Sequence, residues 1–354
     1  MNAQNPRPAS ARTQGDAFPP CIRRVSLTEN GGYARIGKAR KRRKSRGQRA
    51  AGGGYAEMRK LLWILLLAMC CTAAAEGLTP LPLDDDGVYG AAPQAAGYLS
   101  DWVYEDASIR VEIEAFDYEG LVCLEAKIRI ADPSQIRTTK SSRSFDDSEM
   151  VKSTLMAKKA RAVFAVNGDF FKNNVFGYTY RQCTLVKKRL VNLAAGKYDL
   201  LFIDDQGDFH TVERATEESG QALVDALAAE GRRPVNSFTF GPTLILHGEK
   251  QEFNPELWQG HAPMQRVAIA QTGPLSYSVF QCDGSTGDCT GLTMSQFADM
   301  MLSRCDTILV GYNLDGGGSA NLVFRNEKIN DNRDVRQICD MIYFASIDYA
   351  EEKK

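Results

Sequence analysis

The chain has 354 residues, enough for two average domains, and its 43 Lys and Arg nearly balance its 44 Asp and Glu. The balance is uneven along the chain. Residues 1–75 hold 15 of the basic and 3 of the acidic residues, and the remainder carries a net charge of −13. This acidic excess excludes the broad basic surface of a nucleic-acid-binding protein after residue 75, so we expect no nucleic-acid partner.

Residues 1–57 are rich in Gly, Arg and Lys and poor in large apolar residues, and they predict a basic disordered segment. Residues 58–75 have the pattern of a secretory signal peptide: a cationic start at Met58, a short apolar run, and three alanines at the end. We expect a true start at Met58, cleavage before Glu76, and a secreted, extracytoplasmic protein. The alternative is that residues 61–75 form an uncleaved signal anchor, which would make the protein single-pass and membrane-anchored.

Residues 76–100 contain Pro, Gly and Ala without periodicity and predict a linker. One domain is expected over residues 101–348, and a charged tail over residues 349–354. Strands are predicted at 108–115, 121–130, 162–166, 267–270, 277–281, 307–310, 321–325 and 341–345, and helices at 148–159, 216–230 and 293–304. We therefore predict an α+β fold, a single domain with a largely antiparallel or mixed sheet and a few packed helices.

Six of the nine cysteines follow residue 75, and export would permit their oxidation. Cys282 and Cys289 bracket a Gly-rich loop and are the first candidates for a disulfide, and the other cysteines could equally be buried free thiols at strand positions. The chain has three His, and no two cysteines are separated by two residues, so we expect no zinc and no cofactor. A structural Ca²⁺ near the Asp-rich loops stays an alternative.

Two segments offer polar groups beside apolar strands. Asn167, Gly168 and Asp169 directly follow the predicted strand at 162–166, where they present an amide and a carboxylate or simply form a turn. Residues 240–248 combine a Gly-Pro bend, an apolar strand and a Gly turn, a pattern that is also typical of an ordinary hairpin.

Two further segments point to an anion. Arg266 is the charged residue of an apolar strand, and a buried guanidinium needs either a protein carboxylate or a substrate phosphate. Asp315 ends another apolar strand, and the three glycines after it would let the backbone approach a ligand and turn N–H groups toward an anion. The alternative for this run is a flexible loop.

These segments, in this order, resemble the phosphodiester glycosidase family over most of the chain after residue 75. The motif at residues 312–320 is specific, and residues 132–137 and 335–343 fit the family's framework. The family motif residues carried over by position are Asn167, Gly168, Arg266, Asp283, Gly284, Asp315, Gly316, Gly317 and Ser319. Asp169 occupies a variable position, and Gln265 and Ala270 depart from the family pattern, which puts substrate detail in question.

The resemblance implies a hydrolase that cleaves the anomeric C–O bond of a sugar-1-phosphate diester, on envelope or extracellular glycans, releasing free sugar and a phosphomonoester. Phosphate is stable as an anion, so cationic and N–H stabilisation can partly replace a strong general acid. Asp315 would be base or nucleophile, Arg266 would grip the phosphate, and Asn167 would fix sugar hydroxyls. Asp169 is a further catalytic candidate. The residues expected to bind substrate are Gly168, Asp283, Gly316, Gly317, Gly318 and Ser319.

Two other functions remain open at this level. The same residues could form a non-catalytic envelope protein that binds phosphorylated glycans, or a hydrolase of neutral glycans. The presence of Asp315, Arg266 and Asn167 together favours an enzyme over a binding protein, because a site that had lost its chemistry need not keep all three.

Overall fold

The computed structural model describes residues 77–142, 149–169, 177–190, 196–253, 260–284, 291–331 and 335–348. All of them belong to one compact unit. The predicted basic segment, signal peptide and charged tail lie outside the described residues. A search of the described helices found none with the length and apolar character needed to cross a membrane.

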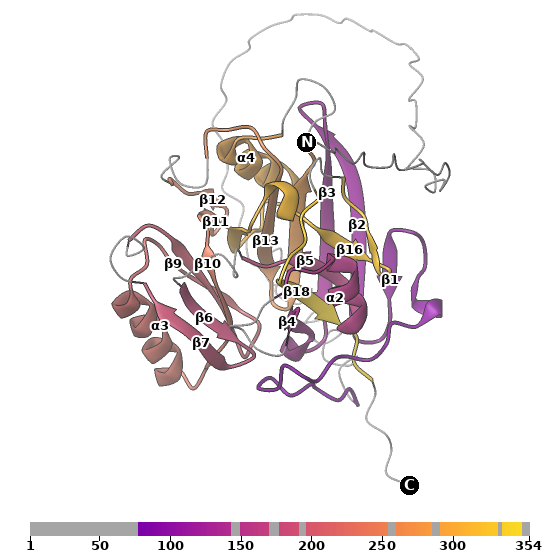
Figure 1. Ribbon diagram of the computed structural model, residues 1–354, viewed down its shortest axis with the longest axis horizontal. Helices are drawn as coiled ribbons and strands as arrows, with labels where there is room; N and C mark the ends of the chain where they lie inside the picture. The colour runs from indigo at the N-terminus through magenta and orange to yellow at the C-terminus, as the bar shows by residue number, and fades with distance from the viewer. Residues whose placement is uncertain are drawn as a thin grey trace, which may run out of the picture. The chain divides into compact units, whose positions relative to one another are not determined.

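The largest sheet has eight strands, and each is antiparallel to its neighbours (Figure 1). In spatial order these strands are β1 (Val103–Glu105), β2 (Ile109–Tyr118), β3 (Leu121–Ile130), β14 (Ser276–Cys282), β13 (Arg266–Gly273), β15 (Val310–Asn313), β11 (Thr243–Leu246) and β12 (Glu249–Lys250). Burial alternates along the first half of β2, as expected for a strand that packs one face on a core.

A second antiparallel sheet has five strands, and β5 lies at its centre with every residue buried. In spatial order they are β17 (Glu327–Lys328), β16 (Leu322–Phe324), β5 (Ala162–Asn167), β18 (Asp340–Ala345) and β4 (Ile136–Lys140). A three-stranded sheet holds β10 (Pro234–Phe240), β8 (Asp199–Asp204) and β9 (Phe209–Val212), and a hairpin holds β6 (Gly177–Arg181) and β7 (Thr184–Arg189).

The main core lies between the two larger sheets, where Val267 and Ile269 of β13 join Val166 of β5 and Ile342 of β18 in one buried cluster. Helix α4 (Met294–Arg304) packs on the opposite face of the eight-stranded sheet, and helix α2 (Ser153–Lys159) packs on the opposite face of the five-stranded sheet. Helix α3 (Glu217–Ala229) lies beside β6, β7 and β9 (Figure 1).

The predicted antiparallel sheets and packed helices are present, but strands predominate so strongly that the described part is mostly β rather than evenly α+β. The predicted helices at 216–230 and 293–304 are confirmed, and each begins after a Thr whose hydroxyl caps the first turn. The helix predicted at 148–159 begins only at Ser153, because Val151 pairs with Ile338 as a β-bridge. The strand predicted at 307–310 begins at Val310, because residues 306–307 form a turn.

The segment expected to be a linker packs on the domain from residue 77 onward. The buried guanidinium of Arg137, on β4, donates to the main-chain oxygens of Pro82, Asp85 and Val88, and its Nε donates to the hydroxyl of Tyr343. One residue therefore fixes residues 82–88 to the five-stranded sheet. We call residues 77–91 the N-terminal arm.

Cys282 is a free thiol, and Cys289, its expected disulfide partner, lies outside the described residues. The main-chain N–H of Arg266 donates to the sulfur of Cys282 at 3.3 Å. Cys123 is directly opposite Cys282 across β3 and β14, and both are fully buried. Cys123 is thus a buried free thiol at a strand position, as expected for the cysteines outside the Cys282–Cys289 pair.

We expect Arg137→Met to release the N-terminal arm. The change leaves carbonyl oxygens of the arm without their donor, and it should lower the free energy of unfolding in urea by about 2–4 kcal/mol. Hydrogen exchange should quicken at residues 82–88. Arg129→Met, on the exposed side of β3, is the matched control and should change neither quantity; equal exchange of the arm in both variants would contradict this role of Arg137.

Candidate active site

Asn167, the last residue of β5, joins three segments through its side chain. Its Nδ2 donates to the main-chain oxygens of Asp315, at 2.7 Å, and Gly168, at 3.1 Å, and its Oδ1 accepts from the main-chain N of Asn321, at 3.0 Å. The side chain is buried. Asn167 therefore fixes the main chain of Asp315, and protein groups already engage both ends of its amide.

Gly168 makes room for a carboxylate. Because β18 runs antiparallel to β5, Asp340 at the start of β18 lies next to Gly168 at the end of β5. A Cβ atom on Gly168 would lie 2.4 Å from Oδ2 of Asp340. The glycine is thus required by close approach of a buried side chain, and any larger residue would displace Asp340.

Asp169 and Asp340 share one guanidinium. Nη2 of Arg181 lies 3.3 Å from Oδ1 of Asp169 and 2.8 Å from Oδ2 of Asp340, and all three side chains are 2% exposed. The guanidinium also lies over the ring of Phe238, 4.5 Å from its centroid, and Asp169 accepts from the main-chain N of Thr239 at 2.9 Å. One cation therefore faces two buried carboxylates.

Side chains of β10 hold the strand that carries Arg181. The hydroxyl of Ser237 accepts from the main-chain N of Tyr180 at 2.7 Å and donates to the main-chain O of Tyr178 at 2.7 Å. The hydroxyl of Thr239 accepts from the N of Tyr178 at 3.0 Å. Buried hydroxyls thus take the place of a backbone ladder between β6 and β10, and they set the position of Arg181.

Asp315 follows β15, and its carboxylate meets the hydroxyl of Ser319. Burial raises the pKa of Asp315 to about 6; the charge of Asp169 adds to the rise, while Ser319 and Arg336 oppose it. Arg336 is exposed, and its Nη1 lies 3.4 Å from Oγ of Ser319. A guanidinium at the surface thus stands beside a carboxylate that is still partly protonated near pH 6.

Asp340 and Lys187 complete the electrostatic group. Burial raises the pKa of Asp340, as do the charges of Asp169 and Asp315, and Arg181 opposes the rise. Burial lowers the pKa of Lys187, which interacts with the same carboxylates. A carboxyl that keeps its proton near neutral pH can act as an acid, and an ionised carboxylate near it can act as a base or nucleophile.

The backbone of Arg266 lies near the glycines that follow Asp315, while its side chain points to the opposite face of the sheet, away from the carboxylates. Val267 of β13 faces the core between the sheets, so the alternation of the strand turns Arg266 toward α4, together with Ala268. Its Nη2 donates to the main-chain O of Ala262 at 2.9 Å, and its Nε donates to that of Leu292 at 3.3 Å. Main-chain carbonyls, which the sequence did not suggest, are thus partners of this guanidinium.

The glycine run is tightly packed against β13. A Cβ on Gly316 would lie 2.6 Å from the main-chain O of Gln265, and Gly317 has φ +58°, so both positions favour glycine for backbone reasons. The N–H of Gly317 donates to Gln265 O at 2.9 Å, and that of Ser319 donates to Gly316 O at 3.1 Å. These two amides are therefore engaged by the protein rather than turned toward an open anion site.

Asp283 belongs to a different group. It accepts from Nε2 of Gln281 at 2.8 Å, and burial raises its pKa to about 6, with Asp331 adding to the rise and Lys328 opposing it. Asn167, Asp169 and Asp315 thus come together, with Gly168 and Ser319 beside them. Asp283 and the guanidinium of Arg266 lie elsewhere in the described part of the chain.

Sequence reasoning did not single out Asp340, Arg181, Lys187 and Arg336 as site residues. Asp340 and Arg336 fall in the segment 335–343 that resembles the family framework, and each could have been marked as a charge next to an apolar strand. Arg181 ends a strand rich in tyrosine and offers the same weak signal. Their convergence depends on strand register, which the sequence alone does not provide.

The described part of the chain is thus a mostly antiparallel β fold that gathers aspartates beside cations, and paired carboxylates are the groups that glycosidases use as acid and base. A family model described as phosphodiester glycosidase matches residues 160–345, and the chain belongs to this family of hydrolases. All the residues of the carboxylate group described above fall inside the matched range.

Solved structures resemble the chain at low identity. The catalytic domain of zebrafish N-acetylglucosamine-1-phosphodiester alpha-N-acetylglucosaminidase, auto-inhibited by its pro-peptide, is 16% identical with a TM-score of 0.49, over 73% of this chain and 87% of that chain. A hypothetical protein from Synechocystis is 13% identical with a TM-score of 0.45, over 67% of this chain and 62% of that chain. A Burkholderia pseudomallei protein described as exported is 12% identical with a TM-score of 0.37, over 64% of this chain and 74% of that chain. The comparison with curated proteins gave no match.

We expect the acidic limb of the pH profile of kcat/KM to fall near pH 6, because Asp315, with a pKa raised to about 6, must be ionised to act as base or nucleophile. Arg336→Met removes a cation that lowers this pKa, so the limb should move to higher pH. Arg336→Lys keeps the charge and should leave the limb in place. A limb near the ordinary aspartate value of about 4 would assign the profile to a different group.

Proposed function

We propose that this protein is an extracytoplasmic hydrolase that cleaves the anomeric C–O bond of a sugar-1-phosphate diester. Water supplies the new oxygen on C1, the electron pair of the broken bond leaves with the phosphate oxygen, and the products are free sugar and a phosphomonoester. The phosphodiester would belong to an envelope or extracellular glycan. Membership of the phosphodiester glycosidase family supports the reaction class.

One arrangement carries the proposal: the main chain of Asp315 is held by Asn167 beside the buried pair of Asp340 and Arg181, and Arg336 lies next to Ser319 at the surface. Asp315 acts as base or nucleophile at the anomeric carbon, since it is mostly ionised above pH 6. Asn167 positions it by holding its main-chain oxygen. Asp340 keeps a proton available in the same site.

The phosphate needs cations more than it needs a strong acid. When the C1–O bond breaks, the leaving phosphate gains a second negative charge, and guanidinium or ammonium groups stabilise that charge. Arg336 is the exposed cation beside Asp315, and Lys187 is a second cation that interacts with the buried carboxylates. Asp169 contributes by holding Arg181 in place.

We expect Asp315→Asn to lower kcat/KM for a sugar-1-phosphodiester at least about a hundred-fold, because a positioned base or nucleophile is lost. Release of free sugar and of phosphomonoester measures the reaction. Asp299→Asn, an exposed carboxylate on α4, is the matched control and should keep full activity. A folded Asp315→Asn protein that retains more than about a tenth of the wild-type rate would remove Asp315 from the chemistry.

The roles of Arg336 and Arg266 can be distinguished by comparing a charged substrate with a neutral one. Arg336→Met should lower kcat/KM for the phosphodiester by about ten-fold or more, and that for a neutral aryl glycoside much less, because the lost attraction is to phosphate. Arg266→Ala should lower both activities by the same factor and lower the melting temperature, because its guanidinium bonds to the carbonyls of Ala262 and Leu292. A selective loss in Arg266→Ala would return the phosphate-gripping role to Arg266.

A further inference from the structure

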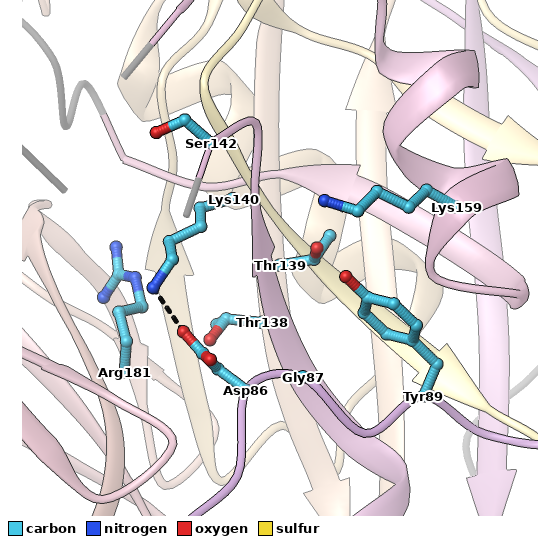
Figure 2. A pocket seen from close by; sticks show the side chains of 9 residues that line it. All are labelled: Asp86, Gly87, Tyr89, Thr138, Thr139, Lys140, Ser142, Lys159 and Arg181. Carbon is cyan, nitrogen blue, oxygen red and sulfur yellow. Dashed lines mark hydrogen bonds and ion pairs between the residues drawn. The ribbon is translucent and has the colours of Figure 1, made fainter. Parts of the chain in front are cut away.

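A cavity of about 460 Å³ adjoins the carboxylate site at Arg181, and its other lining residues have no part in the reaction proposed above (Figure 2). Its wall includes the ammonium-bearing side chains of Lys140 and Lys159 and the hydroxyl-bearing side chain of Thr139. Arg181 also lines it, with its guanidinium paired to Asp169 and Asp340. Ammonium and hydroxyl groups around one concave space are donors that can bind a phosphate group.

The anionic residue in the wall of this cavity comes from the N-terminal arm. The carboxylate of Asp86 pairs with Nζ of Lys140, as the dashed line in Figure 2 shows. Arg137 holds the arm through the main-chain oxygens of Asp85 and Val88, on both sides of Asp86 in sequence. Asp86 is thus fixed by its backbone, and its half-exposed carboxylate occupies the place beside Lys140 where an external anion would bind.

The cavity and the carboxylate site share a wall. Arg181 lines the cavity, and its Nη2 contacts Asp340 on the site side. Lys140 ends β4 directly opposite Asp340 in the antiparallel pairing of β4 and β18. The cavity wall that contains Lys140 and Arg181 therefore adjoins the strand end that carries Asp340.

We propose that this cavity binds a second phosphate group of the substrate, next along the glycan from the one that is cleaved, and that Asp86 competes with that phosphate for Lys140. The proposal rests on the proposed function and narrows it: the substrate is a glycan with repeated phosphates rather than an isolated sugar-1-phosphodiester. Lys159, on the opposite side of Thr139 in Figure 2, provides the second ammonium group.

A purely structural ion pair is the competing explanation, and it makes a different prediction. If Asp86 and Lys140 served only to fasten the arm, Asp86→Asn and Lys140→Met would break the same pair and act in the same direction. If the cavity binds phosphate, the two variants act in opposite directions, because one removes a competitor and the other removes a ligand-binding cation.

The experiment compares two substrates with the full-length protein. One is a sugar-1-phosphodiester of a neutral alcohol, and the other is the same compound with a further phosphate on the alcohol. For the wild type we expect the KM of the second to be about ten-fold lower. This preference should nearly vanish in Lys140→Met and in Lys159→Met, and it should grow several-fold in Asp86→Asn. Lys158→Met, the exposed neighbour on α2, is the matched control and should keep the wild-type preference.

The outcomes are distinguishable. A wild type with no preference, or the same shift in Asp86→Asn and Lys140→Met, overturns the cavity proposal while cleavage of either substrate still upholds the reaction. If the wild type cleaves neither compound, the proposed function fails, and calorimetry with the two-phosphate compound still decides the cavity by the opposite changes in Kd. A third outcome is that inorganic phosphate binds only when Lys140 is present, while the wild type shows no preference between the two substrates. The cavity would then be a site for free phosphate, which contradicts the proposal that it binds a second phosphate of the substrate.

Discussion

The guanidinium of Arg181 is the point on which the site depends, because it lies between two carboxylates that cannot be buried without it. Asp169 comes from the end of β5, Asp340 from the start of β18 and Arg181 from the end of β6. A buried guanidinium or ionised carboxylate without a partner costs several kcal/mol, so Arg181 and an ionised carboxylate beside it are tolerated only when the strand ends meet. The hydroxyl of Ser237, which replaces a backbone ladder between β6 and β10, makes that meeting possible.

The single guanidinium of Arg181 cannot neutralise two ionised carboxylates, and this imbalance shapes the chemistry. It adds to burial in raising the pKa of Asp340, and the charge of Asp169 likewise raises that of Asp315. A phosphodiester anion that entered beside three fully ionised aspartates would be repelled. A proton retained on Asp340 weakens the repulsion, and the exposed Arg336 supplies attraction on the side open to solvent. Proton retention and anion binding are therefore two consequences of the same arrangement.

Local sequence pattern was enough to predict some residues of the site and not others. Asp315 could be singled out because it lies just beyond an apolar strand and before a run of glycines, and α4 because a capping Thr precedes a helical run. Asp340 and Arg181 could not be joined to it, since their meeting depends on the register of β18 against β5 and on side-chain contacts of β10. The lone charge of Arg266 did predict a buried guanidinium; only the fold determines that its partners include main-chain carbonyls on the α4 side.

The glycines of the site show how packing and function become linked. Gly168 lets the carboxylate of Asp340 lie against the backbone of β5, where water is excluded and the pKa rises. Because the folded state then binds a proton more tightly than the unfolded chain does, the carboxyl destabilises the fold as pH rises above the ordinary aspartate range. Asp315 acts with the same sign between its ordinary pKa of 3.8 and about 6. The fold is therefore less stable at neutral pH than it would be with ordinary, solvated carboxylates. The same burial that keeps a proton in the site causes this loss of stability.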